Sequence, residues 1–149
     1  MACHYDDNNI FSKIISKEIP AVIVYEDDTS IAFMDVMPQE EGHLLLIPKQ
    51  GSRNLLDAQP QLLQELILKV QKLAQAIKIA FHADGVMVCQ YNEAAAGQSV
   101  FHLHFHIIPR FNNKPLRGHS KDSSAIERSD LEKQAEKIRH ALSTLANKP

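Results

Sequence analysis

Histidines alternate with apolar residues between Phe101 and Ile108, and this alternation restricts the fold more than any other stretch of the chain. Successive side chains of a β-strand point to opposite faces of a sheet. A strand from Val100 to Ile108, ended by Pro109, would therefore present three imidazoles on one face and an apolar stripe on the other. The imidazole face is predicted to hold His102, His104 and His106, and the core face Phe101, Leu103, Phe105 and Ile107.

Three neighbouring imidazoles are compatible with two kinds of chemistry. Neutral imidazole is the most common metal ligand in proteins, and three histidines can hold a catalytic zinc ion. Alternatively, one imidazole acts as a nucleophile on a phosphorus or acyl centre, while a second imidazole orients it and protonates the leaving group.

The loop ahead of this strand favours the second alternative. Residues 94–99 read Ala-Ala-Ala-Gly-Gln-Ser, and such small side chains allow the backbone to approach a ligand closely. Backbone amides around Gly97 can form a concave anion site, and Ser99 adds a hydroxyl group. We therefore expect a phosphate-binding loop at residues 94–99, here called the cradle loop, beside the histidines.

The rest of the chain indicates an α+β fold of antiparallel strands and a few helices. Asn8 or Asn9 is expected to cap the first helix, and Ser129 or Asp130 the last. A polar loop is expected over residues 111–128. Further strands are predicted over residues 22–25, 30–35, 43–47 and 86–91, and helices over 10–15, 60–81 and from about 130 to 145. The apolar stripe of the long helix is predicted to comprise Leu63, Leu66, Ile67, Val70, Leu73, Ala74, Ile77 and Phe81.

Composition and charge limit the partners and the location. The 149 residues are 44% hydrophobic and 23% charged with a net charge of −2, so no long-range attraction to nucleic acid or to an anionic membrane is expected. The two cysteines, Cys3 and Cys89, do not form a disulfide framework, and the polar N-terminus lacks the apolar core of a signal peptide. We expect a cytoplasmic protein with no nucleic-acid or membrane partner.

The segment Gly97–Arg110, GQSVFHLHFHIIPR, resembles the signature of the histidine-triad (HIT) family. In that signature, Gly-Gln-Ser or Gly-Gln-Thr precedes three histidines that alternate with apolar residues. The Hint-like branch and its bacterial HIT relatives are the most similar. The likeness extends over about residues 8–110 and includes residues 10–15, 17–20, 26–28, 32–35 and 42–49.

This resemblance implies a single HIT domain over residues 1–149, with a core at about 8–110 and a C-terminal loop and helix at 111–149. It implies a five-stranded antiparallel sheet with a long helix, in a homodimer whose two sheets join into one. We expect the dimer contact along the long helix and the strand edge near residues 86–92, because an uncovered strand edge favours association.

The resemblance also implies roles for individual residues. His104 would be the nucleophile that forms a nucleotidyl-histidine intermediate, and His106 would contact phosphate and position His104. The supporting histidines would be His102 and His43. The phosphate oxygens would be held by Gly97, the Gln98 amide and Ser99, the ribose hydroxyls by Asp35, and the base by Ile10, Phe11, Ile14, Phe33 and Val36.

The implied function is hydrolysis at the α-phosphate of a purine nucleoside phosphoramidate or a dinucleoside polyphosphate. His104 would displace the leaving group, and water would then release a nucleoside monophosphate, with no metal or other cofactor required. Two alternatives remain open. One is a non-catalytic nucleotide-binding or interaction protein, and the other is a zinc enzyme that uses all three histidines of the triad.

The sequence departs from the family pattern at a structural zinc site that many relatives have. Their ligands are a Cys-x-x-Cys pair near the first helix, a histidine after the Pro-Lys pair, and the first triad histidine. Here Asn9 and Ser12 replace the cysteine pair, and Gly51 replaces the later histidine. We therefore expect no zinc.

Two further departures concern the leaving group. Many relatives have an amide side chain six positions before the loop glycine, whereas this chain has Tyr91 there, with Asn92 next to it as a substitute. The chain also lacks tryptophan, and with it the tryptophan-containing tail of the Hint relatives. The segment from Phe111 to Pro149 must form that edge of the site or leave it open.

Overall fold

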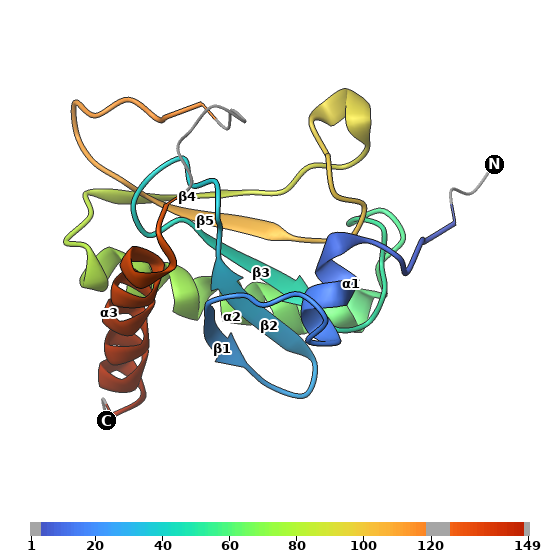
Figure 1. Ribbon diagram of the computed structural model, residues 1–149, viewed down its shortest axis with the longest axis horizontal. Coiled ribbons are helices and arrows are strands. Elements are labelled where there is room, and N and C mark those ends of the chain that lie inside the picture. Colours follow the sequence, from blue (N-terminus) through green and yellow to red (C-terminus); the bar gives the residue numbers. More distant parts are fainter. Residues whose placement is uncertain (1–3, 119–125, 148–149) are drawn as a thin grey trace.

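Five strands form one antiparallel sheet in the computed structural model, which describes residues 4–118 and 126–147 (Figure 1). The strand order is β1-β2-β3-β5-β4. The strands are β1 Ile23–Glu26, β2 Ser30–Met34, β3 Leu44–Pro48, β4 Gly85–Cys89 and β5 Phe105–Arg110. The helices are α1 Ile10–Ile15, α2 Pro60–Ala80 and α3 Arg128–Ala146, and a short 3₁₀ helix spans Ala94–Ala96. The predicted α+β class and five-stranded antiparallel sheet are confirmed.

Different helices cover the two faces of the sheet. α2 and α3 pack on one face, where Leu44 and Leu46 of β3 belong to the larger core cluster (Figure 1). α1 packs on the other face, in a smaller cluster with Leu45 and Ile47. Because successive residues of β3 are buried on opposite faces, this strand reads in the sequence as a continuous apolar run.

The long helix α2 connects β3 to β4, which lie on either side of β5. Its buried side chains are Leu62, Leu66, Val70, Leu73, Ala76 and Ile77. The prediction that Ile67 belongs to this buried stripe is wrong, because Ile67 is 54% exposed. The neighbouring Leu68 is exposed as well, so apolar residues extend around the helix beyond the part that the sheet covers. Helical periodicity alone does not show which of them face the sheet.

The two predicted helix caps have different outcomes. The Asn9 Oδ1 atom accepts hydrogen bonds from the backbone N–H groups of Phe11 and Ser12, both at 3.0 Å, as predicted. α3 begins before Ser129 and Asp130, so the prediction that one of them caps it is wrong. Asp130 lies in the first turn instead, where its negative charge interacts favourably with the helix dipole.

Residues 111–118 and 126–127 are the described parts of the polar loop that was expected between the last strand and the last helix. Residues 119–125 of that loop lie outside the described residues. Within the two described ranges, no helix has the length and apolar character needed to cross a membrane.

The strand that follows the cradle loop begins later and ends later than predicted. β5 starts at Phe105, not at Val100, and it includes Pro109. Pairing of β5 with β3 ends at Ile107, so Pro109 lies where only β4 flanks the strand. A residue without a backbone N–H is tolerated at such a position.

His102 and His104 therefore lie in an irregular segment before β5. The predicted alternation persists there, because Leu103 is fully buried in the larger core cluster and its backbone N–H donates to the carbonyl oxygen of Ser52 at 2.8 Å. The prediction that Phe101 anchors the core is wrong, since its ring lies under the guanidinium group of Arg53, 4.2 Å from the ring centroid.

Candidate active site

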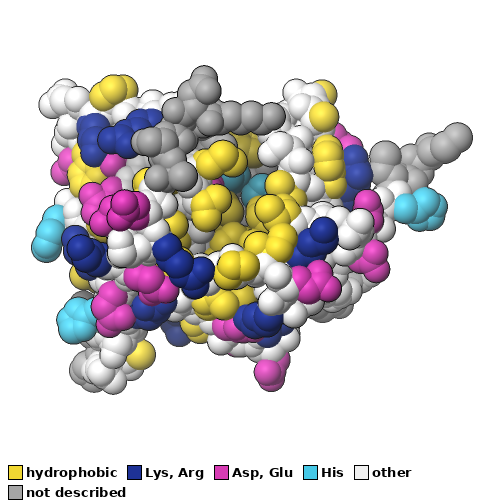
Figure 2. Space-filling model, in the orientation of Figure 1, with side chains coloured by type: hydrophobic (Ala, Val, Ile, Leu, Met, Phe, Trp, Pro, Cys, Tyr) yellow, Lys and Arg dark blue, Asp and Glu magenta, His cyan; other side chains and the backbone are white. Residues whose placement is uncertain are grey.

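A cavity of about 500 Å³ opens on the face of the sheet that carries α1. Figure 2 shows it as a central hollow with an apolar rim and histidine in its depth. This volume is typical of small-molecule sites. The cavity brings together ten residues predicted for the site: Ile10, Phe11, Ile14, Phe33, Asp35, Val36, Gly97, Ser99, His104 and His106. His43 and His102 contact members of this set from behind.

His104 lies in the cavity wall, and the backbone holds its ring. Its Nδ1 atom is 2.7 Å from the carbonyl oxygen of His102. A carbonyl oxygen can only accept, so Nδ1 carries the proton and Nε2 carries the lone pair. The ring of Phe11 packs edge-to-face against the imidazole, with the centroids 5.0 Å apart. The ring of His104 is thus held in the tautomer that a nucleophile requires.

A chain of hydrogen bonds fixes the proton positions of His43 and His106. The backbone N–H of Gln39 donates to Nδ1 of His43 at 3.1 Å, so the proton of neutral His43 is on Nε2. That nitrogen lies 2.9 Å from Nδ1 of His106 and donates to it. Neutral His106 therefore carries its proton on Nε2, which is a donor for an anionic ligand. In the cavity, His104 thus presents a lone pair and His106 a hydrogen-bond donor.

Asp35 is buried at the cavity wall, beside the same histidines. Its Oδ1 atom accepts a hydrogen bond from the backbone N–H of Met37 at 2.8 Å, and its Oδ2 atom lies 3.4 Å from Nε2 of His43. A carboxylate held in this way offers acceptor oxygens suited to hydroxyl groups of a ligand.

Gln98 holds the cradle loop from behind. Its side-chain Oε1 atom accepts hydrogen bonds from the backbone N–H of Glu93 at 2.8 Å and from Nδ2 of Asn54 at 3.1 Å. Its Nε2 atom donates to the carbonyl oxygens of Arg53 at 2.7 Å and Val100 at 3.0 Å. Its backbone N–H donates to the carbonyl oxygen of Glu93 at 3.1 Å. Both amides of Gln98 are therefore engaged within the protein, so the structure gives Gln98 a supporting position and not the expected contact with phosphate.

Two residues give the cradle loop its shape through positive φ angles. Gly97 has φ +102°, in the left-handed region that favours glycine. Glu93, immediately before the loop, has φ 74° and ψ 159°, a conformation that residues with side chains rarely adopt. The guanidinium group of Arg53 binds both carboxylate oxygens of Glu93 at 2.8 Å and holds it there. Gly97 and Ser99 remain exposed at the cavity rim, where they can meet a ligand.

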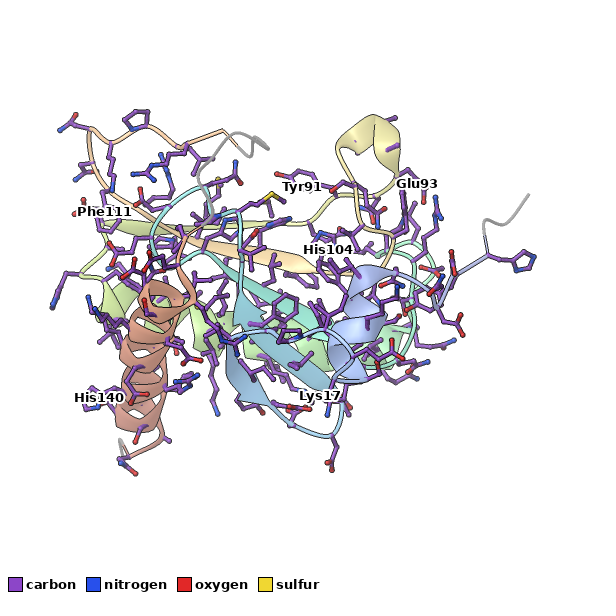
Figure 3. All side chains as sticks on the ribbon, in the orientation of Figure 1. Lys17, Tyr91, Glu93, His104, Phe111 and His140 are labelled. Carbon is purple, nitrogen blue, oxygen red and sulfur yellow. The ribbon has the colours of Figure 1, made fainter. Side chains whose placement is uncertain are left out.

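Tyr91, and not Asn92, reaches the cavity from the end of β4 (Figure 3). The Asn92 Oδ1 atom accepts from the backbone N–H of Leu55 at 2.9 Å, and its amide also bonds to Gln90. The structure therefore does not bring Asn92 to the site. The Tyr91 ring lies 5.6 Å from the His106 ring between centroids, so an aromatic ring lies here in place of the amide that the family resemblance implied. The position of Tyr91 in the sequence, six residues before Gly97, is the signal that indicates a place for this residue in the site.

His102 is fully buried, and both of its ring nitrogens are bonded. Its Nε2 atom is 2.8 Å from the carbonyl oxygen of Pro48, and its Nδ1 atom is 2.6 Å from the hydroxyl oxygen of Tyr5. Burial, with a smaller contribution from the nearby His104, lowers the pKa of His102 to about 4 against the opposing effect of the Pro48 bond. His102 is therefore neutral at physiological pH.

We predict that the free energy of unfolding falls as the pH decreases from about 6.5 to about 4. In the unfolded chain, His102 regains its ordinary pKa of about 6.5. As the pH falls through this window, the unfolded state therefore binds a proton before the folded state does. The contribution of neutral His102 to the free energy of unfolding is complete above the window and is lost below it. The loss approaches about 3 kcal/mol. Chemical denaturation at several pH values measures it.

His102→Gln should flatten this pH dependence, because it removes the group that titrates. His140→Gln, at an exposed position on α3, is the control and should keep the slope of the wild type. Equal slopes in wild-type and His102→Gln proteins would contradict the prediction.

One set of possible metal ligands occurs among the described residues. Ligand atoms of Asp35, His43 and His106 lie within 4.8 Å of one another, but the two histidines are already bonded to each other. The set includes neither His102 nor His104. It therefore does not support the alternative of a zinc ion held by all three triad histidines.

An antiparallel sheet that brings alternating histidines to an apolar cavity, beside a glycine-containing loop, defines a histidine-triad protein. The model of the HIT domain family matches residues 16–113. The chain therefore belongs to the HIT family of nucleotide-binding hydrolases and transferases.

Three solved structures show how far the likeness extends. A HIT-like protein from Bartonella henselae, described as involved in cell-cycle regulation, is 56% identical with a TM-score of 0.86, over 93% of this chain and 99% of that one. A hypothetical histidine triad nucleotide-binding protein from Sulfolobus tokodaii is 34% identical with a TM-score of 0.81, over 89% and 91%. A zinc-bound histidine triad family protein from Mycobacterium smegmatis is 32% identical with a TM-score of 0.82, over 93% and 96%. These matches confirm the HIT-like fold.

The residues of this chain do not fit a zinc ion at the site that the family resemblance implies. The side chain of Asn9 caps α1, and the hydroxyl of Ser12 is bonded to that of Tyr5 at 2.8 Å. Gly51 offers no ligand atom, and the Nδ1 atom of His102 already accepts from Tyr5.

Proposed function

We propose that this protein hydrolyses purine nucleoside phosphoramidates or dinucleoside polyphosphates at the α-phosphate. The observation that carries the proposal is the bond from Nδ1 of His104 to the carbonyl oxygen of His102, because it leaves the lone pair on Nε2. An imidazole held in this way in a cavity wall is suited to attack on phosphorus.

The reaction proceeds in two displacements. In the first, Nε2 of His104 forms a bond to the α-phosphorus, and the bond from phosphorus to the leaving group breaks. The leaving group departs with the electron pair and takes up a proton from solvent, and His104 becomes a cationic nucleotidyl-imidazolium that keeps its proton on Nδ1. In the second, water attacks the phosphorus and releases a proton to solvent, the P–N bond breaks with its electron pair returning to Nε2, and a nucleoside monophosphate is released. His104 is thereby restored to its neutral form.

The other residues of the cavity bind the substrate and stabilise charge. The Nε2–H group of His106 and the rim residues Gly97 and Ser99 contact the phosphate oxygens. Asp35 accepts hydrogen bonds from the ribose hydroxyls. The base lies against the apolar wall formed by Ile10, Phe11, Ile14, Phe33 and Val36.

Incubation with an adenylyl phosphoramidate and with diadenosine polyphosphates tests the proposal. We expect adenosine monophosphate to be released with multiple turnovers, as measured by chromatography of the products. Binding of adenosine monophosphate by calorimetry without release from any of these substrates would instead favour the alternative of a non-catalytic nucleotide-binding protein.

We further propose a homodimer joined along α2 and the edge strand β4. β4 ends the strand order, and Val88 on it and Ile67 on α2 are exposed apolar residues. Light scattering at micromolar concentration should give about twice the 16.8 kDa of one chain. Val88→Asp should shift the mass toward the monomer, and a monomeric wild-type protein would contradict the prediction.

A further inference from the structure

The hydroxyl group of Tyr5 lies among three polar side chains behind the triad. Its oxygen is 2.6 Å from Nδ1 of His102, 2.8 Å from Oγ of Ser12 and 3.1 Å from Nδ2 of Asn9. The Nε2 atom of His102 carries the ring proton, because its partner, the carbonyl oxygen of Pro48, can only accept. The lone pair of His102 is therefore on Nδ1, and the Tyr5 hydroxyl donates to it.

The ring of Tyr5 is fixed by close packing. It lies edge-to-face with the imidazole of His102, with the centroids 5.6 Å apart. It also covers Gly51 so closely that a Cβ atom there would lie 2.5 Å from Cε1 of Tyr5. A side chain at position 51 and the Tyr5 ring cannot share this space, so the glycine is what admits the tyrosine.

One residue connects the Tyr5 hydroxyl to the nucleophile. The carbonyl oxygen of His102 accepts from Nδ1 of His104, so the position of His102 determines the orientation and the tautomer of His104. Ser12 lies in α1 and Asn9 caps it, so the same hydroxyl also ties a wall of the cavity to the triad.

We infer that Tyr5 is a positioning residue of this site, and that its hydroxyl takes the place of a structural metal ion in fixing His102. Through the carbonyl oxygen of His102, it holds His104 in the orientation for attack. This inference rests on the proposed function.

Tyr5→Phe tests the inference, because it removes the hydroxyl and keeps the ring over Gly51. We expect kcat for release of the nucleoside monophosphate to fall about 10-fold or more, and KM to change less than about 2-fold, because alignment is lost and ground-state contacts remain. Tyr25→Phe is the matched control, since it removes a hydroxyl that is bonded to Asp27 away from the cavity. It should keep the wild-type kcat. An unchanged kcat in Tyr5→Phe would overturn the inference.

Nitrogen NMR of the histidine rings provides a readout that does not require turnover. In Tyr5→Phe, the Nδ1 signal of His102 should move toward that of a ring nitrogen with no donor. An unmoved signal would show that the hydroxyl is not bound to this ring, and the inference would then be wrong whether or not the protein is a hydrolase. If the signal moves, yet His104→Ala turns over like the wild type, the proposed function fails and the positioning role fails with it.

Substitution of Gly51 tests whether the Tyr5 ring lies over this glycine. Gly51→Ala should lower the melting temperature of the wild type, because the added Cβ meets the tyrosine ring, but should have little effect in a Tyr5→Ala background. Equal effects in both backgrounds would show that the Tyr5 ring does not lie over Gly51.

The zinc content of the protein tests whether the Tyr5 hydroxyl stands in place of a metal ion. Elemental analysis after dialysis against a chelator should find well under one zinc per chain. Stoichiometric zinc would show that Tyr5 does not replace a metal ion.

Discussion

His104→Ala should abolish release of the nucleoside monophosphate, with a loss in kcat on the order of 10⁴-fold or more, because the other imidazole of the cavity wall, His106, presents an N–H group and not a lone pair. Nucleotide binding should survive, since Asp35, the cradle loop and the apolar wall are unchanged. Turnover measured by chromatography and affinity measured by calorimetry separate the two effects.

His106→Ala is the informative comparison. In the proposed function its ring donates to phosphate, and the ring is bonded to His43, so the variant should be slow but should keep measurable turnover. Rapid quenching of the wild-type enzyme during turnover should trap a nucleotidyl group on the peptide that contains residues 102–106. The quench must avoid acid, because acid cleaves phosphoramidate bonds. Near-normal turnover of His104→Ala, or an adduct on His102 or His106, would show that the nucleophile is assigned incorrectly.

Gln98→Ala should have the largest effect on stability of the substitutions near the cavity. The Gln98 side chain is buried and makes four hydrogen bonds, to Glu93, Asn54, Arg53 and Val100. Each buried group left without a partner costs about 1–3 kcal/mol, so we expect a loss of about 3 kcal/mol or more in the free energy of unfolding. Urea denaturation measures this loss.

The same variant distinguishes a supporting role from a phosphate contact. If Gln98 held phosphate, its removal would raise KM and leave stability near that of the wild type. Gln64→Ala, at an exposed position of α2, is the matched control and should change stability by less than about 0.5 kcal/mol. A Gln98→Ala protein as stable as this control would contradict the supporting role.

Elements that depend on local signals were predictable from the sequence. The Asn9 cap requires only the next three residues, and its hydrogen bonds are as predicted. The histidine face was predictable although β5 starts only at Phe105, because Leu103 keeps the alternation in an irregular segment. The family motif is contiguous, and four of the residues it names, Gly97, Ser99, His104 and His106, line the cavity.

Features that depend on distant partners were not predictable. Phe101 was expected in the core, but Arg53 offers its ring another partner. The engagement of Gln98 also depends on Arg53 and Asn54, which no periodicity connects to the cradle loop. Tyr5 is 97 positions from His102, in a segment with no pattern of its own.

Because α1 is short, its opening and closing depend on whether a ligand occupies the cavity. A helix of six residues is too short to be stable alone, so α1 depends on the packing of Phe11 and Ile14 in the cluster that contains Phe33. These three residues also line the cavity, so opening of the helix removes part of the binding surface. A ligand that binds only the closed form raises the free energy of that opening by mass action. We therefore expect a bound nucleotide to slow amide hydrogen exchange in α1, so that this helix reports whether the site is filled.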